Sequence, residues 1–439
     1  MNVTNSSKKI HLYIEKSNPK SGKLLLDFLD VNEFADFIKS GLKHINTENI
    51  DEIPSLIMVD VERIPPAIIL YEGGMLTITF RKLLNICLDS EDGPKTNFGV
   101  NNSHNKAQIL PFLSVIKNQT QFLSLLKDPG TKISQKTPKN YKIPMNKVID
   151  ATNQEIIKAL KELIGDNLHV IIFDVGQGSA SAVLSSKGGI IYDLGSDAFR
   201  STELAYLKNK LNQIKCATNG INGKVLILSH WDIDHYNLIN GIDDNDMKSL
   251  KLVLFPTEAF GVYAGRVYAR IQANCKNSSW AIVPANRRKV KNKIGLELFC
   301  SSQHIKLFRG ETSPNKNRSG LLVTVKGRDG IIMLGGDHSN YQIWELMYHQ
   351  IGVNNEEINA VAPHHGSPWC LKLKLPQVSN YGVVAISAGK DNDYRHPNSN
   401  VVTQYAVAGF TVKCTEQGPQ TNTKTGNILI NQKDITINL

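Results

Sequence analysis

The sequence lacks the features that mark membrane proteins, secreted proteins and zinc knuckles. It has no long uncharged apolar run, and residues 1–15 are polar and charged where a secretion signal would carry its apolar core. Its six cysteines are widely spaced and form no Cys-x-x-Cys pair, so they predict neither a zinc knuckle nor a disulfide framework. We therefore expect a cytoplasmic protein that does not enter a membrane, with most cysteines serving as small core residues.

Two common nucleotide-binding folds are also excluded. No glycine-rich loop ends in Gly-Lys-Ser/Thr, as a P-loop requires. Gly176-Gln177-Gly178 follows the strand-like run 170–173, as a dinucleotide-binding turn would. The residues that come next, 181–192, predict a strand, a turn and a second strand, whereas the dinucleotide fold needs a helix there.

Length and patterning predict two domains. A chain of 439 residues exceeds what one core usually serves, and 41% hydrophobic with 21% charged residues is ordinary for a folded protein. Strand-like runs at 10–14, 55–59 and 75–80, with an amphipathic segment at 31–45, predict a small α/β accessory domain over 1–127. Its role is unknown, and it is a candidate for binding a protein partner. A basic linker over 128–150 and a second domain over 151–439, opened by a helix over 152–164, complete the prediction.

The densest group of chemically active residues is the segment Ser229–His235. Four potential metal ligands follow directly after the branched apolar run 225–228, which predicts a buried strand that ends in a ligand-bearing loop. His230 and Asp232 are two residues apart and can point the same way, whereas Asp234 and His235 are neighbours and must diverge. Two pairs of donors suggest two ions. The alternative is a solvated polar turn that contains histidines by chance.

Three further acidic or histidine elements also follow apolar runs. Asp337 comes after 331–334, His364-His365 after 358–363, and His396, past a polar loop, after 383–387. An Asp after one strand is usually a turn former. Four such units in succession instead describe a sheet whose strand ends converge on one pocket.

The order of these motifs resembles the metallo-β-lactamase superfamily, most closely the hydrolase domain of the DNA-uptake protein ComEC and its soluble relatives. The resemblance covers about residues 168–439. The motifs that carry it are Phe173-Asp174-Val175-Gly176-Gln177-Gly178, Ile191-Tyr192-Asp193-Leu194-Gly195, Ser229–His235, Asn315-x-Asn317-x-Ser319, Leu334-Gly335-Gly336-Asp337, Pro363-His364-His365-Gly366-Ser367, Arg395-His396-Pro397 and the strand through 410–413.

This resemblance implies a four-layer αββα sandwich and a centre of two divalent metal ions. The implied ligands are His230, Asp232, Asp234, His235, the bridging Asp337, and one of His364 and His365, of which we assign His365. Asp193 is implied to support the ligand loop, and Asp174 either does the same or makes a structural hydrogen bond.

Two departures from the family pattern affect the metal prediction. Most members carry His where this chain has Asp232, and the harder carboxylate oxygen favours Mn²⁺ over Zn²⁺. No convincing candidate stands for the extra histidine that many members place before the bridging acid. His304 is the only histidine in that interval.

Charge balance favours a phosphate ester as substrate. Two divalent ions, three aspartates and one hydroxide sum to about zero, which leaves open coordination positions for an anion. Two metal ions can activate a water and stabilise both the attacking and the leaving oxygen. Asp234 counts among the catalytic residues through its place in this centre. His396 or the non-ligating His364 is expected to protonate the leaving group.

A net charge of +10 points to a polyanionic partner. The densest basic cluster lies between the main ligand motif and Asp337, where it could hold a nucleic-acid backbone, although basic runs are also ordinary solvated surface. The nearby Tyr263, Tyr268 and Trp280 could stack on bases or pack in the core. The cluster comprises Arg287, Arg288, Lys289, Lys291 and Lys293.

The sequence thus predicts a metal-dependent phosphodiesterase, foremost a nuclease acting on DNA or RNA. One alternative is a hydrolase of the same fold that acts on a small ester, a cyclic nucleotide or a lactone, since fold does not fix substrate. The other is a non-catalytic binding module that kept the scaffold.

Overall fold

The computed structural model describes most of the second half of the chain and selected segments of the first. The described residues are 8–18, 20–30, 33, 56–62, 64–65, 68, 70–80, 82–83, 115–116, 119–128, 131–134, 147–150, 154–163, 167–257, 261–286, 295–313, 315–346, 356–368, 380–390, 392–415, 430–432 and 434–439. The basic cluster 287–293, the predicted amphipathic segment 31–45 except Glu33, most of the predicted linker, and Cys87 and Cys370 lie outside them.

The chain forms two compact units. Unit 1 comprises 1–143, 199–207 and 261–266, and unit 2 comprises 144–198, 208–260 and 267–439. The division into an accessory domain at 1–127, a linker at 128–150 and a main domain at 151–439 stays a prediction.

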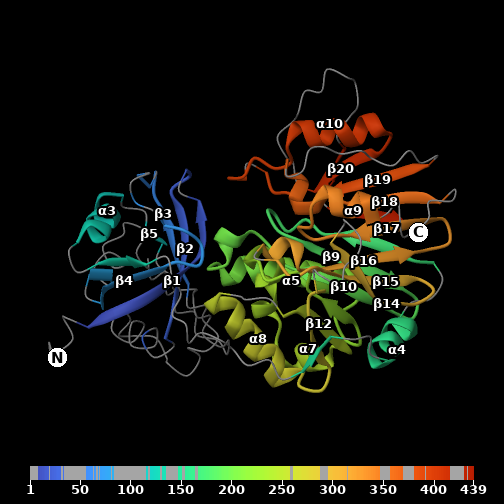
Figure 1. Ribbon diagram of the computed structural model, residues 1–439, viewed down its shortest axis with the longest axis horizontal. Coiled ribbons are helices and arrows are strands. Elements are labelled where there is room, and N and C mark those ends of the chain that lie inside the picture. The colour runs from blue at the N-terminus through green and yellow to red at the C-terminus, as the bar shows by residue number, and fades with distance from the viewer. Residues whose placement is uncertain are drawn as a thin grey trace, which may run out of the picture. The chain divides into compact units, whose positions relative to one another are not determined.

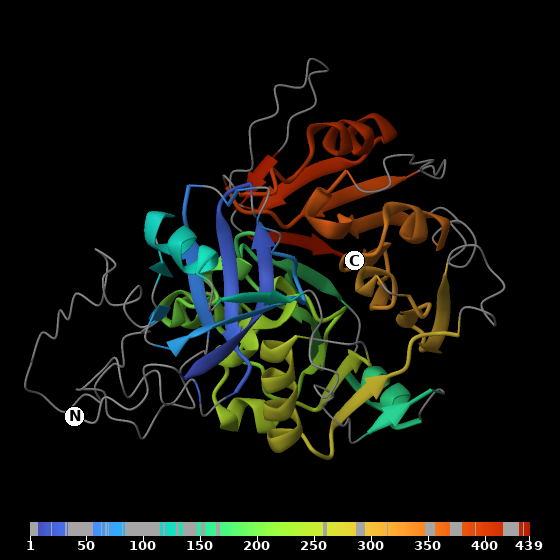
Figure 2. The same ribbon diagram turned by 60° about the vertical axis from the view of Figure 1, so that its left-hand side comes forward.

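Unit 1 is a small α/β module built on a six-stranded sheet, as the sequence predicts (Figure 2). The three apolar runs correspond to strands at 9–18, 56–60 and 75–79, whose inward-facing side chains, such as Ile10, Leu12 and Ile78, are fully buried. The strand order is β5 (Val115–Ile116), β3 (Leu56–Asp60), β2 (Lys23–Phe28), β1 (Lys9–Asn18), β4 (Met75–Thr79) and β6 (Lys132–Ser134), and helix α3 spans Gln119–Lys127.

Unit 2 contains two eight-stranded sheets, of which the first is drawn mainly in green and the second mainly in orange to red in Figure 1. The first sheet has the order β22 (Ile435–Asn438), β8 (His169–Ile172), β9 (Ala180–Ser185), β10 (Gly188–Leu194), β11 (Val225–Ile227), β12 (Leu252–Pro256), β13 (Ser279–Ile282) and β7 (Val148–Ile149). The second has the order β14 (Leu296–Ser301), β15 (Ile305–Gly310), β16 (Leu321–Lys326), β17 (Gly330–Leu334), β18 (Glu357–Val361), β19 (Tyr381–Ile386), β20 (Thr411–Thr415) and β21 (Ile430–Gln432).

The two sheets pack face to face. One buried cluster joins Val183 and Ile227 of the first sheet to Leu307 and Val323 of the second. Burial of such aliphatic side chains stabilises the fold by roughly 25 cal/mol for each Å² of apolar surface removed from water, so this layer is the main source of the unit's stability. The strands of this core are buried on both faces, which explains their continuous apolar sequences.

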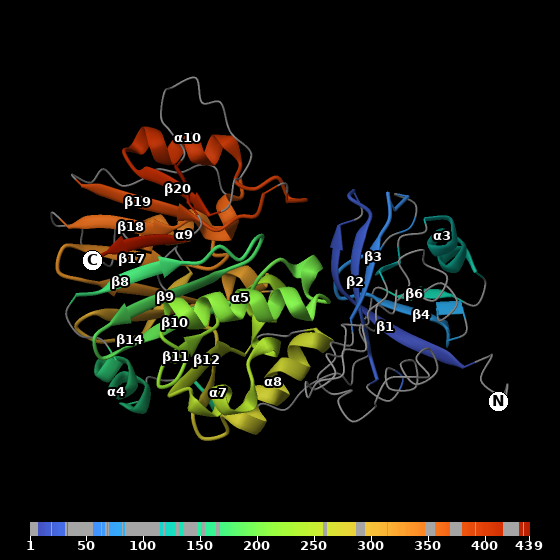
Figure 3. The ribbon, with the colours of Figure 1, turned by 180° about the vertical axis from the view of Figure 1, so that it is seen from behind.

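Helices cover the outer faces of both sheets. On the second sheet, α9 (Asn340–Leu346) and α10 (Ser399–Ala408) pack Trp344 and Tyr405 against a cluster that includes Met333 and Val384 (Figure 1). On the first sheet, α5 (Leu204–Ala217) and α8 (Val262–Asn274) lie on the outside, and Tyr268 of α8 meets Phe255 of β12 with ring centroids 5.5 Å apart (Figure 3). The predicted αββα fold class is therefore confirmed.

Several local predictions can be compared with the structure. The predicted helix at 152–164 is α4 (Gln154–Leu163), whose buried residues Ile156, Ala159, Leu160 and Leu163 follow helical spacing. The segment after Gly178 forms the antiparallel pair β9–β10, as expected when the dinucleotide fold is excluded. No helix in the described part of the chain is long and apolar enough to cross a membrane.

One local prediction needs correction. The ligand segment is not all loop, because Asp234 and His235 lie on the one-turn helix α6 (Ile233–Tyr236) that follows the extended Asp232.

The structure also decides between two roles that the sequence left open. Tyr263 and Tyr268 are 1% and 2% exposed, so they pack in the core and do not stack on bases. Of the cysteines, Cys275, Cys300 and Cys414 are buried free thiols, whereas Cys216 is exposed.

Gly195 shows how closely β10 approaches the ligand helix. A Cβ atom added there would lie 1.9 Å from the carbonyl oxygen of Asp234 and 2.5 Å from the Cα atom of His235. Contacts under about 3 Å with backbone atoms force the backbone to move.

We expect Gly195→Ala to lower the melting temperature by at least about 5 °C, because α6 must shift away from β10. Gly220→Ala is the control, since a Cβ there meets nothing within 4 Å and adds only left-handed backbone strain at a φ of 77°. Circular dichroism melting curves of both variants test this expectation. Equal losses in the two variants would contradict it.

Candidate metal centre

The ligand candidates gather where strand ends of the two sheets meet. From the first sheet, β10 ends beside Asp193 and β11 leads to His230 and His235. From the second, β17 leads to Asp337 and β18 to the 3₁₀ turn η6 (Pro363–Gly366) that carries His364 and His365. The strands β17, β18 and β19 run parallel, so their carboxyl ends share one edge of the sheet.

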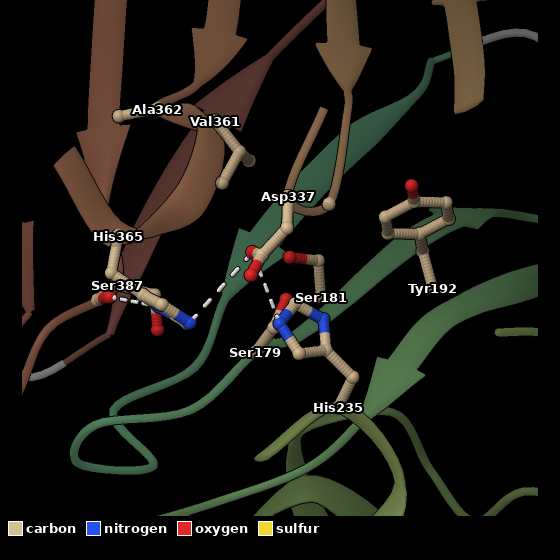
Figure 4. Close-up of a pocket in the computed structure, with 10 residues that line it drawn as sticks. Ser179, Ser181, Tyr192, His235, Asp337, Val361, Ala362, His365 and Ser387 are labelled. Carbon is tan, nitrogen blue, oxygen red and sulfur yellow. Dashed lines mark hydrogen bonds and ion pairs between the residues drawn. The ribbon is translucent and has the colours of Figure 1, made fainter. Parts of the chain in front are cut away.

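Figure 4 shows the centre of this pocket. The side chains of His235 and His365 point from opposite sides toward the carboxylate of Asp337. His235 Nε2 lies 3.1 Å and His365 Nε2 lies 4.0 Å from Asp337 Oδ1. On the other carboxylate oxygen, His364 Nδ1 lies at 3.1 Å and His230 Nε2 at 3.7 Å. Four imidazoles from two sheets thus surround one buried carboxylate.

Two groups of donors are spaced for holding a metal ion. The first is His230, His235 and Asp337, and the second is Asp234, His235 and His365. The donor atoms within each group all lie within 4.8 Å of one another, and all of these residues are buried. Asp232 belongs to neither group. Its Oδ2 lies 3.4 Å from His230 Nε2, while its Oδ1 contacts the ammonium group of Lys316.

Asp193 orients the ligand segment. It is fully buried at the end of β10, and its Oδ1 accepts a hydrogen bond of 2.6 Å from the backbone amide of Ser229. Its Oδ2 accepts the Ser229 hydroxyl at 2.9 Å and lies 2.8 Å from His235 Nδ1. With Nδ1 held in this way, the Nε2 atom of His235 faces Asp337.

The surroundings of His230 and His235 shift the pKa values of the two rings in opposite directions. Burial disfavours the charged form of both rings. The carboxylates of Asp337 and Asp193 nevertheless hold the pKa of His235 well above its ordinary value. Burial and the neighbouring His235 lower the pKa of His230 to about 3, so that ring is neutral and offers a lone pair.

The residues expected to transfer protons lie at the edge of this cluster. The His364 side chain is 28% exposed, more than any of its carboxylate or imidazole neighbours in the cluster. Its ring centroid lies 6.0 Å from that of His396. Burial, together with His365 and His364, lowers the pKa of His396 to about 3, so this ring is neutral near pH 7. His396 is therefore a weak base near pH 7, and holding a proton on it requires an added negative charge beside it.

Asp174 lies apart from the donor groups. Its Oδ2 lies 3.6 Å from Lys210 Nζ, and its Oδ1 accepts a long hydrogen bond of 3.4 Å from the amide of Gly176. Its own amide donates to Asp434. These contacts hold the loop before Gly178, and the role of Asp174 stays a prediction.

Three positioning contacts could not be deduced from the sequence. His365 Nδ1 lies 2.8 Å from the carbonyl oxygen of Ser387, which fixes the ring. Asn317 Nδ2 lies 3.2 Å from His364 Nδ1, and Lys316 meets Asp232. The pattern Asn315-x-Asn317-x-Ser319 marked this turn only through the family resemblance, and no periodicity signals which of its side chains face the centre.

The comparisons with known proteins concern the fold. No protein-family profile and no curated protein matches the sequence. Among solved structures, the human short-form tRNase Z is similar with 10% identity and a TM-score of 0.35, covering 61% of this chain and 98% of its own. The metallo-β-lactamase fold protein YhfI from Bacillus subtilis has 9% identity and a TM-score of 0.33, covering 57% and 97%. Zn²⁺-bound PqqB from Methylobacterium extorquens has 10% identity and a TM-score of 0.33, covering 57% and 98%. At such values these likenesses assign no residue role and no substrate to this chain.

Proposed function

We propose that the protein is a metal-dependent phosphodiesterase whose foremost substrate is nucleic acid. The observation that carries this proposal is the cluster of four imidazoles around the buried carboxylate of Asp337. Burying several ionisable groups together is costly unless a charge of opposite sign or a metal ion compensates them. A cluster of this kind therefore indicates a functional site more strongly than a structural role.

The donor atoms fit divalent metal ions. The buried Nε2 atoms of His230 and His365 make no hydrogen bond within the described part of the chain, which is the state expected of metal-ligating atoms. Nε2 of His235 and Oδ1 of Asp337 lie 3.1 Å apart and face the same space. The set mixes imidazole nitrogen with carboxylate oxygen, and we assign it to two Mn²⁺ ions, with Zn²⁺ as the alternative. When bound, such ions supply a nucleophilic water near neutral pH and stabilise charge on phosphoryl oxygens.

The surrounding residues are assigned three roles, which are binding the ions, orienting a ligand and donating a proton. Asp337 belongs to the donor group of His230, and its Oδ1 lies 4.0 Å from Nε2 of His365 in the other group. We therefore assign it the bridging position. Asp193 holds His235 in the ligating orientation through Nδ1. We assign His364, whose side chain is 28% exposed, the delivery of a proton to the leaving oxygen, with the neighbouring His396 as the alternative donor.

Nucleic acid is favoured among phosphodiesters by charge. The chain carries a net charge of +10, and the basic cluster 287–293 lies in the sequence between the two main ligand motifs. A backbone of repeated phosphates gains affinity from each lysine or arginine it meets. One observation favours a second candidate, a small phosphodiester such as a cyclic nucleotide. The donor residues are at most 8% exposed, and a small substrate reaches buried donors more easily than a bulky duplex does.

Replacing the bridging acid should abolish turnover. We expect Asp337→Ala to reduce Mn²⁺-dependent cleavage of DNA and RNA to background, because both proposed metal ions lose a carboxylate ligand. Asp329→Ala is the matched control, since Asp329 is an exposed acid paired with Arg328, and it should keep full activity. Gel assays on single- and double-stranded substrates measure both. Undiminished cleavage by a folded Asp337→Ala protein would reject the proposed site.

Removing the charge of Asp193 should weaken metal binding. We expect Asp193→Asn to lower Mn²⁺ affinity about 10–100-fold, because an amide supports the His235 ring less well than a carboxylate does. Equilibrium dialysis with metal analysis measures the affinity. Asp243→Asn, at the cap of the surface helix α7 (Asp244–Ser249), should leave it unchanged. Equal affinities in the two variants would show that Asp193 has no role in the metal centre.

Salt should separate the two substrate classes. If the basic cluster holds a polymer backbone, KM for DNA or RNA rises steeply between about 50 and 200 mM salt, by about tenfold for every two phosphate contacts. KM for a small phosphodiester such as bis-p-nitrophenyl phosphate should change little. Parallel salt responses for both substrates would favour the small-substrate function.

A further inference from the structure

The turn between β15 and β16 places a lysine at the proposed metal centre. This turn contains the 3₁₀ helix η4 (Lys316–Arg318), which the side chain of Asn315 caps by accepting the amide of Asn317 at 3.1 Å. Behind it, the amide of Leu321 donates to the carbonyl oxygen of Ser229 at 2.7 Å. The turn is therefore fixed directly against the first residue of the ligand segment.

Close packing leaves this turn little freedom to move. A Cβ atom on Gly320 would lie 2.6 Å from the carbonyl oxygen of Ser229, and one on Gly310 would lie 2.0 Å from that of Arg318. Both glycines are thus required where the turn meets its neighbours. The position of the Lys316 backbone is consequently set by the fold and does not depend on the lysine side chain itself.

The Lys316 ammonium group and the ring of His230 share the carboxylate of Asp232. Lys316 Nζ contacts Oδ1, whereas Oδ2 lies 3.4 Å from His230 Nε2. The Asp232 side chain is 11% exposed and that of Lys316 is 38% exposed. A metal ion held by His230 Nε2 and Asp232 Oδ2 would therefore lie next to a carboxylate that already carries a bound positive charge.

We propose that Lys316 acts as an internal cation that competes with the metal ion at His230 and Asp232, so that the two ions of the centre bind with unequal affinity. The inference rests on the proposed metal centre. The first ion binds Asp234, His235 and His365, whereas Lys316 contacts Asp232. The second binds more weakly, because it must either displace the ammonium group or share Asp232 with it. A fixed positive charge a few ångströms away disfavours a divalent cation even in a high dielectric.

Metal titration tests this directly. The full-length chain is stripped with a chelator and titrated with Mn²⁺, and free Mn²⁺ is followed by electron paramagnetic resonance. We expect the natural protein to bind one ion tightly and a second at least about tenfold more weakly. In Lys316→Met the affinity for the second ion should rise at least about tenfold, while the first is unchanged. Lys316→Arg keeps the positive charge and should keep the weak second site.

The control variant is Lys187→Met, which removes an exposed lysine from the turn between β9 and β10 and should reproduce the natural titration. Melting curves show whether each variant is folded. Two equally tight ions in the natural protein, or an unchanged second affinity in folded Lys316→Met, would overturn the role of Lys316 and leave the proposed function standing. Absence of Mn²⁺ binding in every variant would overturn the metal centre, and with it both proposals.

Discussion

The buried carboxylate of Asp193 is the contact on which the site depends. It has no exposed surface, its backbone adopts a left-handed φ of 57°, and it accepts hydrogen bonds from the amide and the hydroxyl of Ser229. A non-glycine residue in that region stores strain of about 1 kcal/mol or more, which persists only where the surroundings enforce it. Here the surroundings are the start of the ligand segment itself, so strand β10 and the ligands of β11 are fixed to each other.

The second sheet contributes the other half of the site through an equally constrained turn. His364 and His365 both have left-handed backbones, with φ of 48° and 54°. Consecutive left-handed residues send the two adjacent rings to different partners, His365 toward Ser387 and His364 toward Asn317. In an ordinary strand the rings would also diverge, but they would lie on opposite faces of the sheet. The strained turn instead keeps both rings near Asp337.

Much of this arrangement could be predicted from the sequence, because strand-forming runs and the polar residues after them are local signals. The runs at 225–228, 331–334 and 358–363 predicted strand ends that converge, and the structure places Asp337 within 3.7 Å of His230. The split of the segment into an extended part and the helix α6 was not predictable, because a single turn of helix has no periodicity. Nor was the pairing of Asp232 with Lys316, which lie 84 positions apart in the sequence and meet only because β15 and β16 bring that turn to Ser229.

The location of the donors has a mechanical consequence. His230 and His235 follow a strand of one sheet, while Asp337 and His365 follow strands of the other, and the interior between the sheets is mainly aliphatic. An ion bound by both sets would join the layers as a non-covalent cross-link at the rim of the sandwich. Parting of the layers and release of the ion would then be a single thermodynamic event, so cation affinity and resistance to unfolding would rise and fall together.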